Sequence, residues 1–411
     1  MTSPILSVVI PTHNRRAALL EHLAILWKQT TTMPGIEILV VADCCDDGTE
    51  AAVEEWAART GLDLRVLSHR ARSASATRNL GARAARSPTL LFVDDDIEPL
   101  QGFIRFHLDA HKEDDARAGN MAVLGYSKPI FPAPLTLWQK EARLWWLDIF
   151  HAMEAPGYRF TYRNFFSGNV SLPRALFERV GGFNEELARL EDYEFGLRWF
   201  KAGGKLRYDP QACGLHREGT HLPQWLQRIR QEGAADLRTA EMHPEMRSLL
   251  WWPTQRQTLV TTLLRKAAFR YPKKGDRLVT AVAVTAESAA WLGLRGLSRR
   301  LVSTTRSYQY FRGVASLKNF REFAAWLQDG PPPVTIQSDA PVLDMASLPN
   351  NVDEILALGS ERGLRIVYNG VELRTLAPLV GAEPLRMDHV AAFTNSCSGK
   401  HLQHQMASDL R

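Results

Sequence analysis

The chain has 411 residues, of which 45% are hydrophobic and 23% charged, a composition typical of folded globular proteins and not of disordered ones. The length suits two or three domains. The 50 basic residues exceed the 45 acidic residues by five, which would suit an anionic ligand or an acidic membrane surface without deciding between them. Four cysteines without C-x-x-C spacing are too few for a disulfide scaffold, so we expect a reducing compartment, the cytoplasm.

The N-terminal sequence MTSPILSVVIPTHNR lacks the basic leader and long apolar core of a signal peptide. No window of 18 apolar residues is free of charge. The nearest candidate, residues 278–294, contains Glu287 and predicts a buried or interfacial helix. Clustered basic residues between 254 and 303 suit an anionic bilayer or, equally, a solvated helical surface. We therefore expect at most a peripheral contact with the inner face of the membrane.

Strand and helix signals alternate along the first hundred residues. The predicted strands are 6–12, 36–43, 62–69 and 89–96, and the predicted helices between them are 16–29, 49–60 and 75–86. This alternation predicts a doubly wound, mostly parallel α/β sheet. Ligands bind beyond the carboxyl ends of such strands, where Thr12, Asp43 and the aspartates 94–96 would lie.

The remaining chain changes character several times. Residues 131–166 are rich in aromatic side chains, which suit a stacked sugar ring, a hydrophobic core or a lipid-linked acceptor. Short strand and helix signals resume, followed by an arginine-rich helical region and a probable linker, QDGPPPV. We therefore predict a catalytic domain over 1–221, a helical region over 222–328 and a small C-terminal module of unknown role over 334–411. Within the module, Asn369-Gly370 predicts a β-hairpin turn.

The stretch LLFVDDDIEP ends an apolar strand core with three consecutive aspartates. Their carboxylates repel one another unless a cation lies nearby. If the strand continues through them, Asp94 and Asp96 converge on one side while Asp95 points elsewhere. Two convergent carboxylates suit Mg²⁺ or Mn²⁺. The residues alone leave open a solvated loop with helix-capping aspartates.

Four motifs occur in order along the chain: VVIPTHNR, VVADCCDDGT, ATRNLGARAARSPTLLFVDDDIEP and FFSGNVSLPRALFERVGGFNEELARLEDYEFGLRWFKAGGKLRYDPQACGLH. Together they resemble the family-2 glycosyltransferases, which have the GT-A fold, over roughly residues 5–220. The resemblance implies that a sugar passes with inversion from a nucleotide-sugar, expected to be a UDP-sugar, to an acceptor hydroxyl with the help of Mg²⁺ or Mn²⁺. Cys44 and Cys45 stand where small or polar residues are more usual, and either Asp43 or Asp46 would face the nucleobase.

The resemblance also implies roles for individual residues. Asp192 would be the general base, and Glu191 would orient the loop or bind an acceptor hydroxyl. The metal ligands would be Asp94, Asp96 and His216, placed to neutralise the charge that develops on the leaving diphosphate. The nucleotide-sugar site would comprise Pro11, Thr12, Arg15, Asp43, Arg78, Asp94, Asp95, Ser167, Gly168 and Asn169.

Several of these residues have simpler interpretations. Glu191 and Asp192 could merely favour a helix N-terminus, Arg78 could be an exposed helix arginine and His216 a structural histidine. A second set could close over the diphosphate or lie on a solvated helix face: Trp225, Arg228 and Arg230.

The alternative function is a non-catalytic carbohydrate-binding or scaffold protein that retains the fold. A nucleotidyltransferase would need a glycine-rich loop after the first strand, and IPTHNRRAALL has no glycine. The expected acceptor is a carbohydrate, a lipid-linked compound or a small molecule, and no nucleic acid partner is expected.

Overall fold

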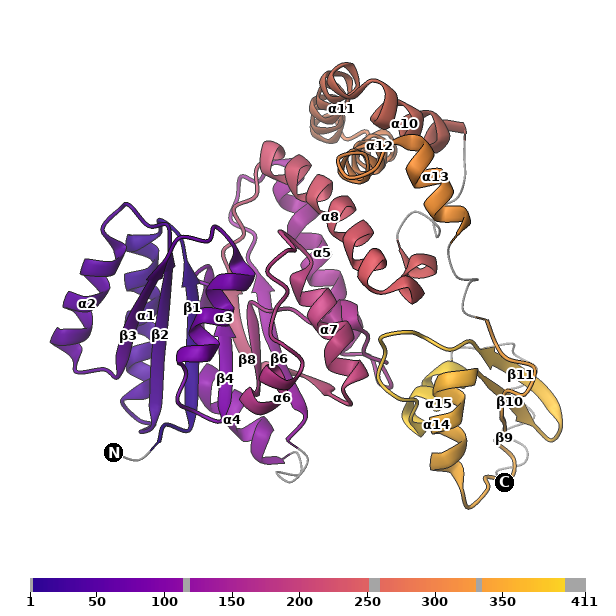
Figure 1. Ribbon diagram of the computed structural model, residues 1–411, viewed down its shortest axis with the longest axis horizontal. Helices are drawn as coiled ribbons and strands as arrows, with labels where there is room; N and C mark the ends of the chain where they lie inside the picture. The colour runs from indigo at the N-terminus through magenta and orange to yellow at the C-terminus, as the bar shows by residue number, and fades with distance from the viewer. Residues whose placement is uncertain (1–2, 114–118, 251–258, 330–334, 396–411) are drawn as a thin grey trace.

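The structure is a computed structural model that describes residues 3–113, 119–250, 259–329 and 335–395. The described residues form a large sheet with flanking helices, a group of helices and a small three-stranded module, seen at the left, upper right and lower right of Figure 1. How the chain divides into independently folding domains stays a prediction. Among the described helices, none combines the length and apolar character needed to cross a bilayer.

The large sheet has the strand order β3-β2-β1-β4-β7-β6-β8-β5. Its strands are β1 (Leu6–Thr12), β2 (Ile36–Asp43), β3 (Leu64–His69), β4 (Thr89–Val93), β5 (Ile97–Pro99), β6 (Met121–Pro129), β7 (Asn169–Pro173) and β8 (Lys205–His216). Strands β3, β2, β1 and β4 are parallel, whereas β7 runs antiparallel to β4 and β6. The predicted α/β sheet is confirmed, with β4 ending at Val93, three residues earlier than predicted.

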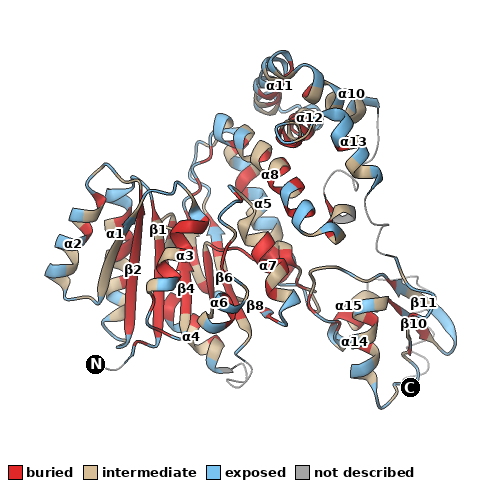
Figure 2. Ribbon diagram, viewed as in Figure 1, coloured by how far each residue is buried: buried red, intermediate tan, exposed pale blue. Residues whose placement is uncertain are grey.

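Helices cover both faces of this sheet. They are α1 (Arg16–Thr30), α2 (Thr49–Thr60), α3 (Ala74–Ala84), α4 (Phe103–Glu113), α5 (Leu137–Met153), α6 (Arg174–Arg179) and α7 (Glu191–Lys201). Alternate residues of the strands enter two separate cores: Val8 packs with Leu19 of α1, and Val9 packs with Ala82 of α3. Strands β1, β2 and β4 are therefore buried on both faces, which Figure 2 shows as red arrows, whereas the edge strand β3 is half-buried.

The helical region consists of α8 (Leu222–Met242), α10 (Leu259–Arg270), α11 (Pro272–Trp291), α12 (Arg295–Val314) and α13 (Phe320–Gln328). A short helix, η2 (Pro244–Leu249), follows α8. This region has a core of its own, in which Trp138 of α5 packs on Trp225 of α8 with ring centroids 4.6 Å apart. Gly233 and Gly313 let α8 and α12 cross closely, since a Cβ on either would meet the backbone of the other helix.

The C-terminal module contains β9 (Val342–Asp344), α14 (Val352–Arg362), β10 (Leu364–Tyr368), β11 (Val371–Leu376) and α15 (Met387–Asn395). The predicted hairpin is confirmed: β10 and β11 pair antiparallel across Asn369 and Gly370, which both have positive φ. The module contacts the short helix η1 (Tyr162–Asn164), where the backbone N–H of Tyr162 donates to the carbonyl of Gly381 at 2.6 Å. Because η1 packs on α7, the module lies beside the helix that carries Glu191 and Asp192.

Candidate active site

The loops that follow β1, β2 and β3 bond to one another and form a rim at the carboxyl edge of the sheet. The ring Nδ1 of His13 lies 2.6 Å from the carbonyl oxygen of Asp43, and the side chain of Asn14 accepts the backbone N–H of Asp46 at 2.8 Å. Each loop contains one non-glycine residue in the left-handed region, namely Asn14, Cys44 and Arg72. Such backbone strain persists only where surrounding contacts enforce it, so the rim is a fixed surface.

Asp43 is the centre of that rim. Its Oδ1 accepts the backbone N–H groups of Ala71 and Arg72, and its Oδ2 accepts that of Ser73 and the hydroxyl of Thr77. Burial raises the pKa of Asp43, but the hydrogen bonds outweigh burial and leave the pKa below its usual value. These four bonds use the acceptor capacity of the carboxylate, so Asp43 shapes the loop, while Asp46 is exposed.

The three consecutive aspartates lie in a turn between β4 and β5. The strand alternation expected of Asp94, Asp95 and Asp96 therefore does not apply, because β4 has already ended. Arg15 lies between two of the carboxylates, with its Nη1 3.0 Å from Asp95 and 3.4 Å from Asp96. The hydroxyl of Thr12, which follows half-buried Pro11, donates to Asp95 at 2.8 Å. A guanidinium thus supplies positive charge to the turn.

Arg78 connects this turn to the second acidic motif. It is buried, and its terminal nitrogens donate to Asp94 at 2.6 Å and to Glu191 at 3.1 Å. Burial lowers the pKa of Arg78, but the carboxylates outweigh burial and leave the pKa raised. The interpretation of Arg78 as an exposed helix arginine is wrong. Its Nη1 and Nη2 groups already donate to carboxylates, so neither is free to bind a nucleobase or a phosphate.

The second acidic motif opens α7 after a strained residue. Leu190 is the N-cap, has a φ of 57° and makes no side-chain capping bond. A large side chain rarely adopts this conformation, which here turns the chain so that Glu191 reaches Arg78. Asp192 lies inside the first turn and accepts the backbone N–H of Tyr193 at 2.9 Å. It is therefore not the N-cap.

The pKa of Asp192 is raised to about 7. Burial is the largest cause, and the neighbouring charge of Glu191 adds to it, while Arg78, Arg189 and the Tyr193 N–H act in the opposite direction. A helix N-terminus alone would favour the opposite shift, because its dipole stabilises an ionised carboxylate. The dipole of a single helix end is the weaker effect here, because desolvation penalises the charged form more strongly. A carboxylate with this pKa suits proton transfer near neutral pH.

These motifs occur within the region that matches known proteins. The model for glycosyl transferase family 2 matches residues 7–181, and a second model, described as the N-terminal domain of galactosyltransferase, matches residues 148–218. These two matches and the fold support a family-2 glycosyltransferase. The chain is a glycosyltransferase, and the sheet described above is its GT-A fold.

Several curated relatives are similar to this glycosyltransferase. Validoxylamine A glucosyltransferase of Streptomyces hygroscopicus subsp. jinggangensis is 26% identical over 310 residues, covering 68% of this chain and 72% of the relative. Pre-mycofactocin glycosyltransferase of Mycobacterium tuberculosis is 27% identical over 248 residues, covering 58% of this chain and 48% of the relative. Among solved structures, the mannosyltransferase PcManGT of Pyrobaculum calidifontis with GDP-Man and Mn²⁺ has 16% identity and a TM-score of 0.48, covering 77% of this chain and 88% of that one.

The glycosyltransferase has a second feature at the aspartate turn, the buried His216 at the end of β8. Its Nε2 lies 3.9 Å from Oδ1 of Asp96, and its Nδ1 has no hydrogen-bond partner among the described residues. No group of three or more His, Cys, Asp or Glu side chains in the described part of the chain is placed to hold a metal. The predicted trio of Asp94, Asp96 and His216 is therefore not preassembled. Asp96 and His216 are the two members of the trio whose facing atoms are this close.

The segment Ser167–Asn169 supports the turn from behind. Gly168 accepts the backbone N–H of Asp94 at 2.9 Å, and a Cβ on this glycine would lie 2.7 Å from Oδ2 of Asp94. Asn169 is fully buried and its side chain bonds His107 and the carbonyl of Ala212. Ser167 is also buried. In this structure these residues support the aspartate turn, and Asn169 faces the core and not a ligand.

The residues proposed to close over a diphosphate do not form such a lid. Trp225 is buried, Arg228 bonds Glu218 at 3.2 Å, and Arg230 bonds Asp276 and Gln309. These side chains join α8 to its neighbours instead. The same contacts exclude a freely solvated face for Arg228 and Arg230.

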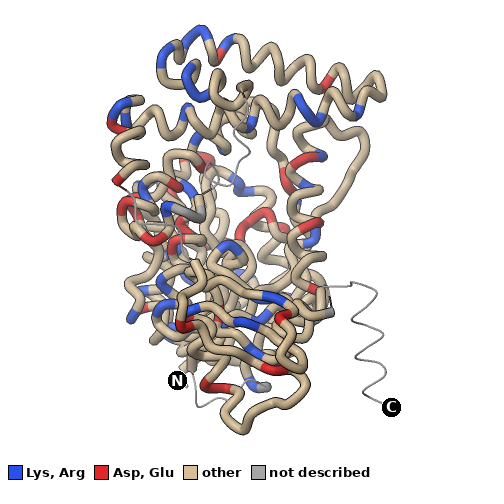
Figure 3. Tube along the Cα trace, turned by 90° about the vertical axis from the view of Figure 1, so that its right-hand side faces the viewer, with Lys and Arg blue, Asp and Glu red and all other residues tan. Residues whose placement is uncertain are grey.

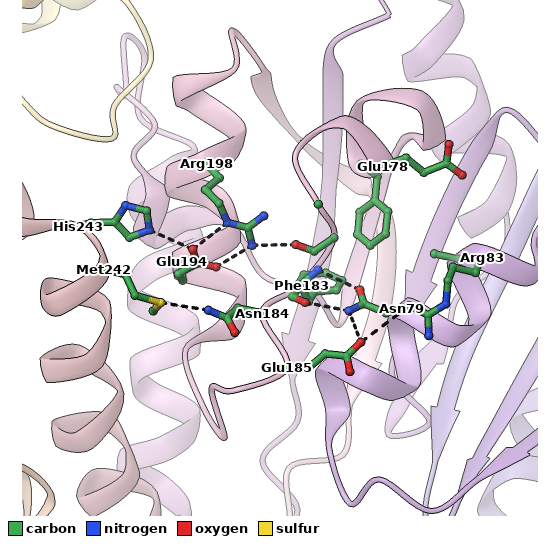
Figure 4. Close-up of a pocket in the computed structure, with 14 residues that line it drawn as sticks. Asn79, Arg83, Glu178, Phe183, Asn184, Glu185, Glu194, Arg198, Met242 and His243 are labelled. Atoms are coloured by element: carbon green, nitrogen blue, oxygen red, sulfur yellow. Dashed lines mark hydrogen bonds and ion pairs between the residues drawn. The ribbon is translucent and has the colours of Figure 1, made fainter. Parts of the chain in front are cut away.

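Asn79, which sequence reasoning did not select, fixes the turn ahead of α7. Its side chain accepts the backbone N–H of Phe183 at 2.9 Å and donates to the carbonyl of the same residue at 2.8 Å. Gly182 has a positive φ, and a Cβ there would lie 2.7 Å from Asn79. Figure 4 shows Asn79 bonded to Phe183 and Glu185. The one sequence feature that could have pointed to Asn79 is its position next to Arg78 in α3.

A cavity of about 690 Å³ lies beside this turn, and Figure 4 shows residues that line it. Its polar lining is internally paired: Glu194 accepts from Arg198 at 2.7 Å and lies 3.0 Å from His243. Burial raises the pKa of Glu194, but these partners outweigh it and lower the pKa. None of the predicted site residues lines the cavity, so we place the candidate active site at the aspartate turn and the start of α7.

Aromatic side chains flank His216 on the side of α5. Trp146 lies edge-on to the His216 ring with centroids 5.2 Å apart, and it stacks on Phe150 at 5.7 Å. Trp145 is 38% exposed beside it. Most of the aromatic segment is therefore hydrophobic core, and Trp145 is the indole with a face open to solvent.

Proposed function

We propose that the chain is an inverting glycosyltransferase that transfers a sugar from a nucleoside-diphosphate sugar, with a UDP-sugar as the expected donor. The observation that carries the proposal is the bridge through Arg78, which joins the aspartate turn to a carboxyl pair whose Asp192 has a pKa of about 7. An acidic turn and a proton acceptor are thus held together by one buried cation. The UDP preference rests on the motif resemblance alone.

The proposed reaction is a single displacement. The acceptor hydroxyl oxygen forms a bond to the anomeric carbon while its proton passes to a carboxylate oxygen of Asp192. The bond between the anomeric carbon and the diphosphate oxygen breaks, and the electron pair leaves with the nucleoside diphosphate. Attack from the face opposite the leaving group inverts the anomeric configuration.

Asp96 and His216 would hold a divalent cation, Mg²⁺ or Mn²⁺. The 3.9 Å separation of Nε2 of His216 from Oδ1 of Asp96 fits this assignment. Two protein ligands suffice for such ions, which usually complete their coordination with phosphate oxygens and water. When bound, the ion would supply positive charge to the leaving diphosphate. Arg15 borders the same turn and would bind phosphate as a second cation.

The anomeric configuration of the product tests the proposal. The protein is screened against nucleotide-sugars with Mn²⁺ by thermal shift, because a bound donor raises the melting temperature. The best donor is then turned over, and the product is followed by proton NMR from the first minutes. We expect inversion. Retention would reject the single displacement, and donor binding without release of nucleoside diphosphate would favour a non-catalytic carbohydrate-binding protein.

A further inference from the structure

The turn between α11 and α12 exposes four large apolar side chains within seven residues. The exposed fractions are 86% for Trp291, 62% for Leu292, 51% for Leu294 and 47% for Leu297. Exposing this much apolar surface to water is unfavourable, and burying it against another apolar surface would lower the free energy. We call residues 291–297 the apolar tip. It lies in the helical region, at the top of Figure 1.

The backbone holds the apolar tip outward. Gly293 has a φ of 75°, and the N–H of Leu294 donates to the carbonyl of Ala289 at 2.8 Å, which ends α11. The hydroxyl of Ser298 donates across the turn to the carbonyl of Ala286 at 3.0 Å. Apart from the adjoining residues and the backbone of the glycine's own helix, no described heavy atom comes within 4 Å of a Cβ placed on Gly293 or Gly296. The tip is therefore a braced protrusion.

The charge around the apolar tip is mainly positive, with Glu287 four residues before Trp291 on α11. Residues 288–311 contain no Asp or Glu and carry four basic residues, namely Arg295, Arg299, Arg300 and Arg306. The three arginines nearest the tip, Arg295, Arg299 and Arg300, are exposed. Figure 3 shows blue segments along these helices at the top of the molecule. On the side of α5, Glu141 faces Arg299 and Arg306; burial raises its pKa, and the two arginines oppose that shift.

We propose that the apolar tip docks on the surface of an anionic lipid bilayer. Trp291 and the three leucines would enter the boundary between headgroups and acyl chains, where indoles are favoured. Arg295 and Arg300 would bind lipid phosphates from beside the tip. A second copy of the chain is the weaker candidate, since a symmetric contact would place the arginines of both copies against one another.

Vesicle co-sedimentation tests the proposal. The full-length protein is mixed with vesicles of phosphatidylcholine alone or with added phosphatidylglycerol. We expect binding to the anionic vesicles that weakens as salt is raised. Replacing Trp291→Ser and Leu292→Ser together should weaken binding roughly tenfold or more. Replacing Arg295→Gln and Arg300→Gln should also weaken it roughly tenfold or more.

Matched controls keep the result specific. Leu278→Ser removes a residue that is 66% exposed on the same helix but outside the tip, and Arg321→Gln removes an exposed charge from α13. Both should bind as the parent does, and circular dichroism confirms that every variant is folded. Equal binding to both vesicle types, no binding, or equal loss in the controls would overturn the proposal. A tip variant that converts a dimer to a monomer in gel filtration without changing vesicle binding would overturn it as well.

Discussion

The two acidic motifs of the candidate active site differ in how their charges are compensated. The aspartate turn has guanidinium partners at close range: Arg78 lies on Asp94, and Arg15 lies between Asp95 and Asp96. At the start of α7, Glu191 forms an ion pair with Nη1 of Arg78, whereas Asp192 accepts only a backbone N–H among the hydrogen bonds described. Both motifs contain a carboxyl group whose pKa is raised mainly by burial: the pKa of Asp192 rises to about 7, and that of Asp95 rises to about 6 although Arg15 opposes the shift.

The largest effect is expected from Asp192→Asn. The substitution keeps shape and hydrogen bonding but removes the basicity, so kcat for sugar transfer should fall by a factor of roughly 10² to 10⁴. Donor affinity, measured by calorimetry, should survive. Glu186→Gln is the matched control, an exposed carboxylate of the same segment, and should transfer at the parent rate. Loss of donor affinity in Asp192→Asn would instead assign Asp192 to the nucleotide site.

The next effect probes the aspartate turn. Asp96→Asn should lower activity by a factor of roughly 10² to 10³, because a charge that stabilises the departing diphosphate is lost. Binding of Mn²⁺ together with a nucleoside diphosphate, measured by electron paramagnetic resonance, should weaken in parallel. Asp109→Asn removes an exposed carboxylate of α4 and serves as the control. Full activity of the parent protein in excess EDTA would contradict the assignment of a metal to this turn.

Breaking the link between the motifs should cost stability as well as activity. Arg78→Met leaves Asp94 and Glu191 without their shared cation, and loss of one partner from a buried ion pair costs about 3 kcal/mol or more. Because Asp94 is one-third exposed, water recovers part of its share. Urea unfolding measures the loss. Arg83→Met, on the same helix with a side chain that is 64% exposed, should change the free energy of unfolding little. Equal stability of both variants would show that the bridge is not structural.

The sequence predicted the sheet because its strand and helix periodicities are strong and local. It also placed the aspartates 94–96 near the carboxyl end of a strand, and Glu191 and Asp192 near the start of a helix. The failures share a cause: they depend on contacts between segments distant in the chain. Nothing local to ATRNLG reveals that Arg78 meets Glu191, 113 residues later, or that Asn79 locks the turn at Phe183. Likewise, the raised pKa of Asp192 follows from tertiary burial, which overrides the local preference of acidic residues for a helix N-terminus.

The smallest effect is a shift in pH dependence. Transfer needs ionised Asp192, so log kcat/KM should rise with pH up to about 7 and then level off. The charge of Glu191 raises the pKa of Asp192. Glu191→Gln should therefore move the rising part of the kcat/KM profile to lower pH by on the order of one unit. Release of Arg78 from Glu191 acts in the same direction. Glu186→Gln should leave the rising part in place, and a rising part that stays or moves to higher pH in Glu191→Gln would contradict the coupling.

Stability reports the same coupling independently of turnover. The folded pKa of Asp192 lies above its ordinary value of 3.8, so the folded state binds this proton more tightly than the unfolded state. The resulting stabilisation is complete below about pH 4 and is lost as pH rises toward 7. An asparagine side chain does not ionise in this pH range, so it contributes no such pH dependence to stability. Asp192→Asn should therefore melt at a higher temperature than the parent at pH 8, whereas the difference should disappear at pH 4. An equal difference at both pH values would mean that Asp192 is already ionised throughout this range and that burial does not set its pKa.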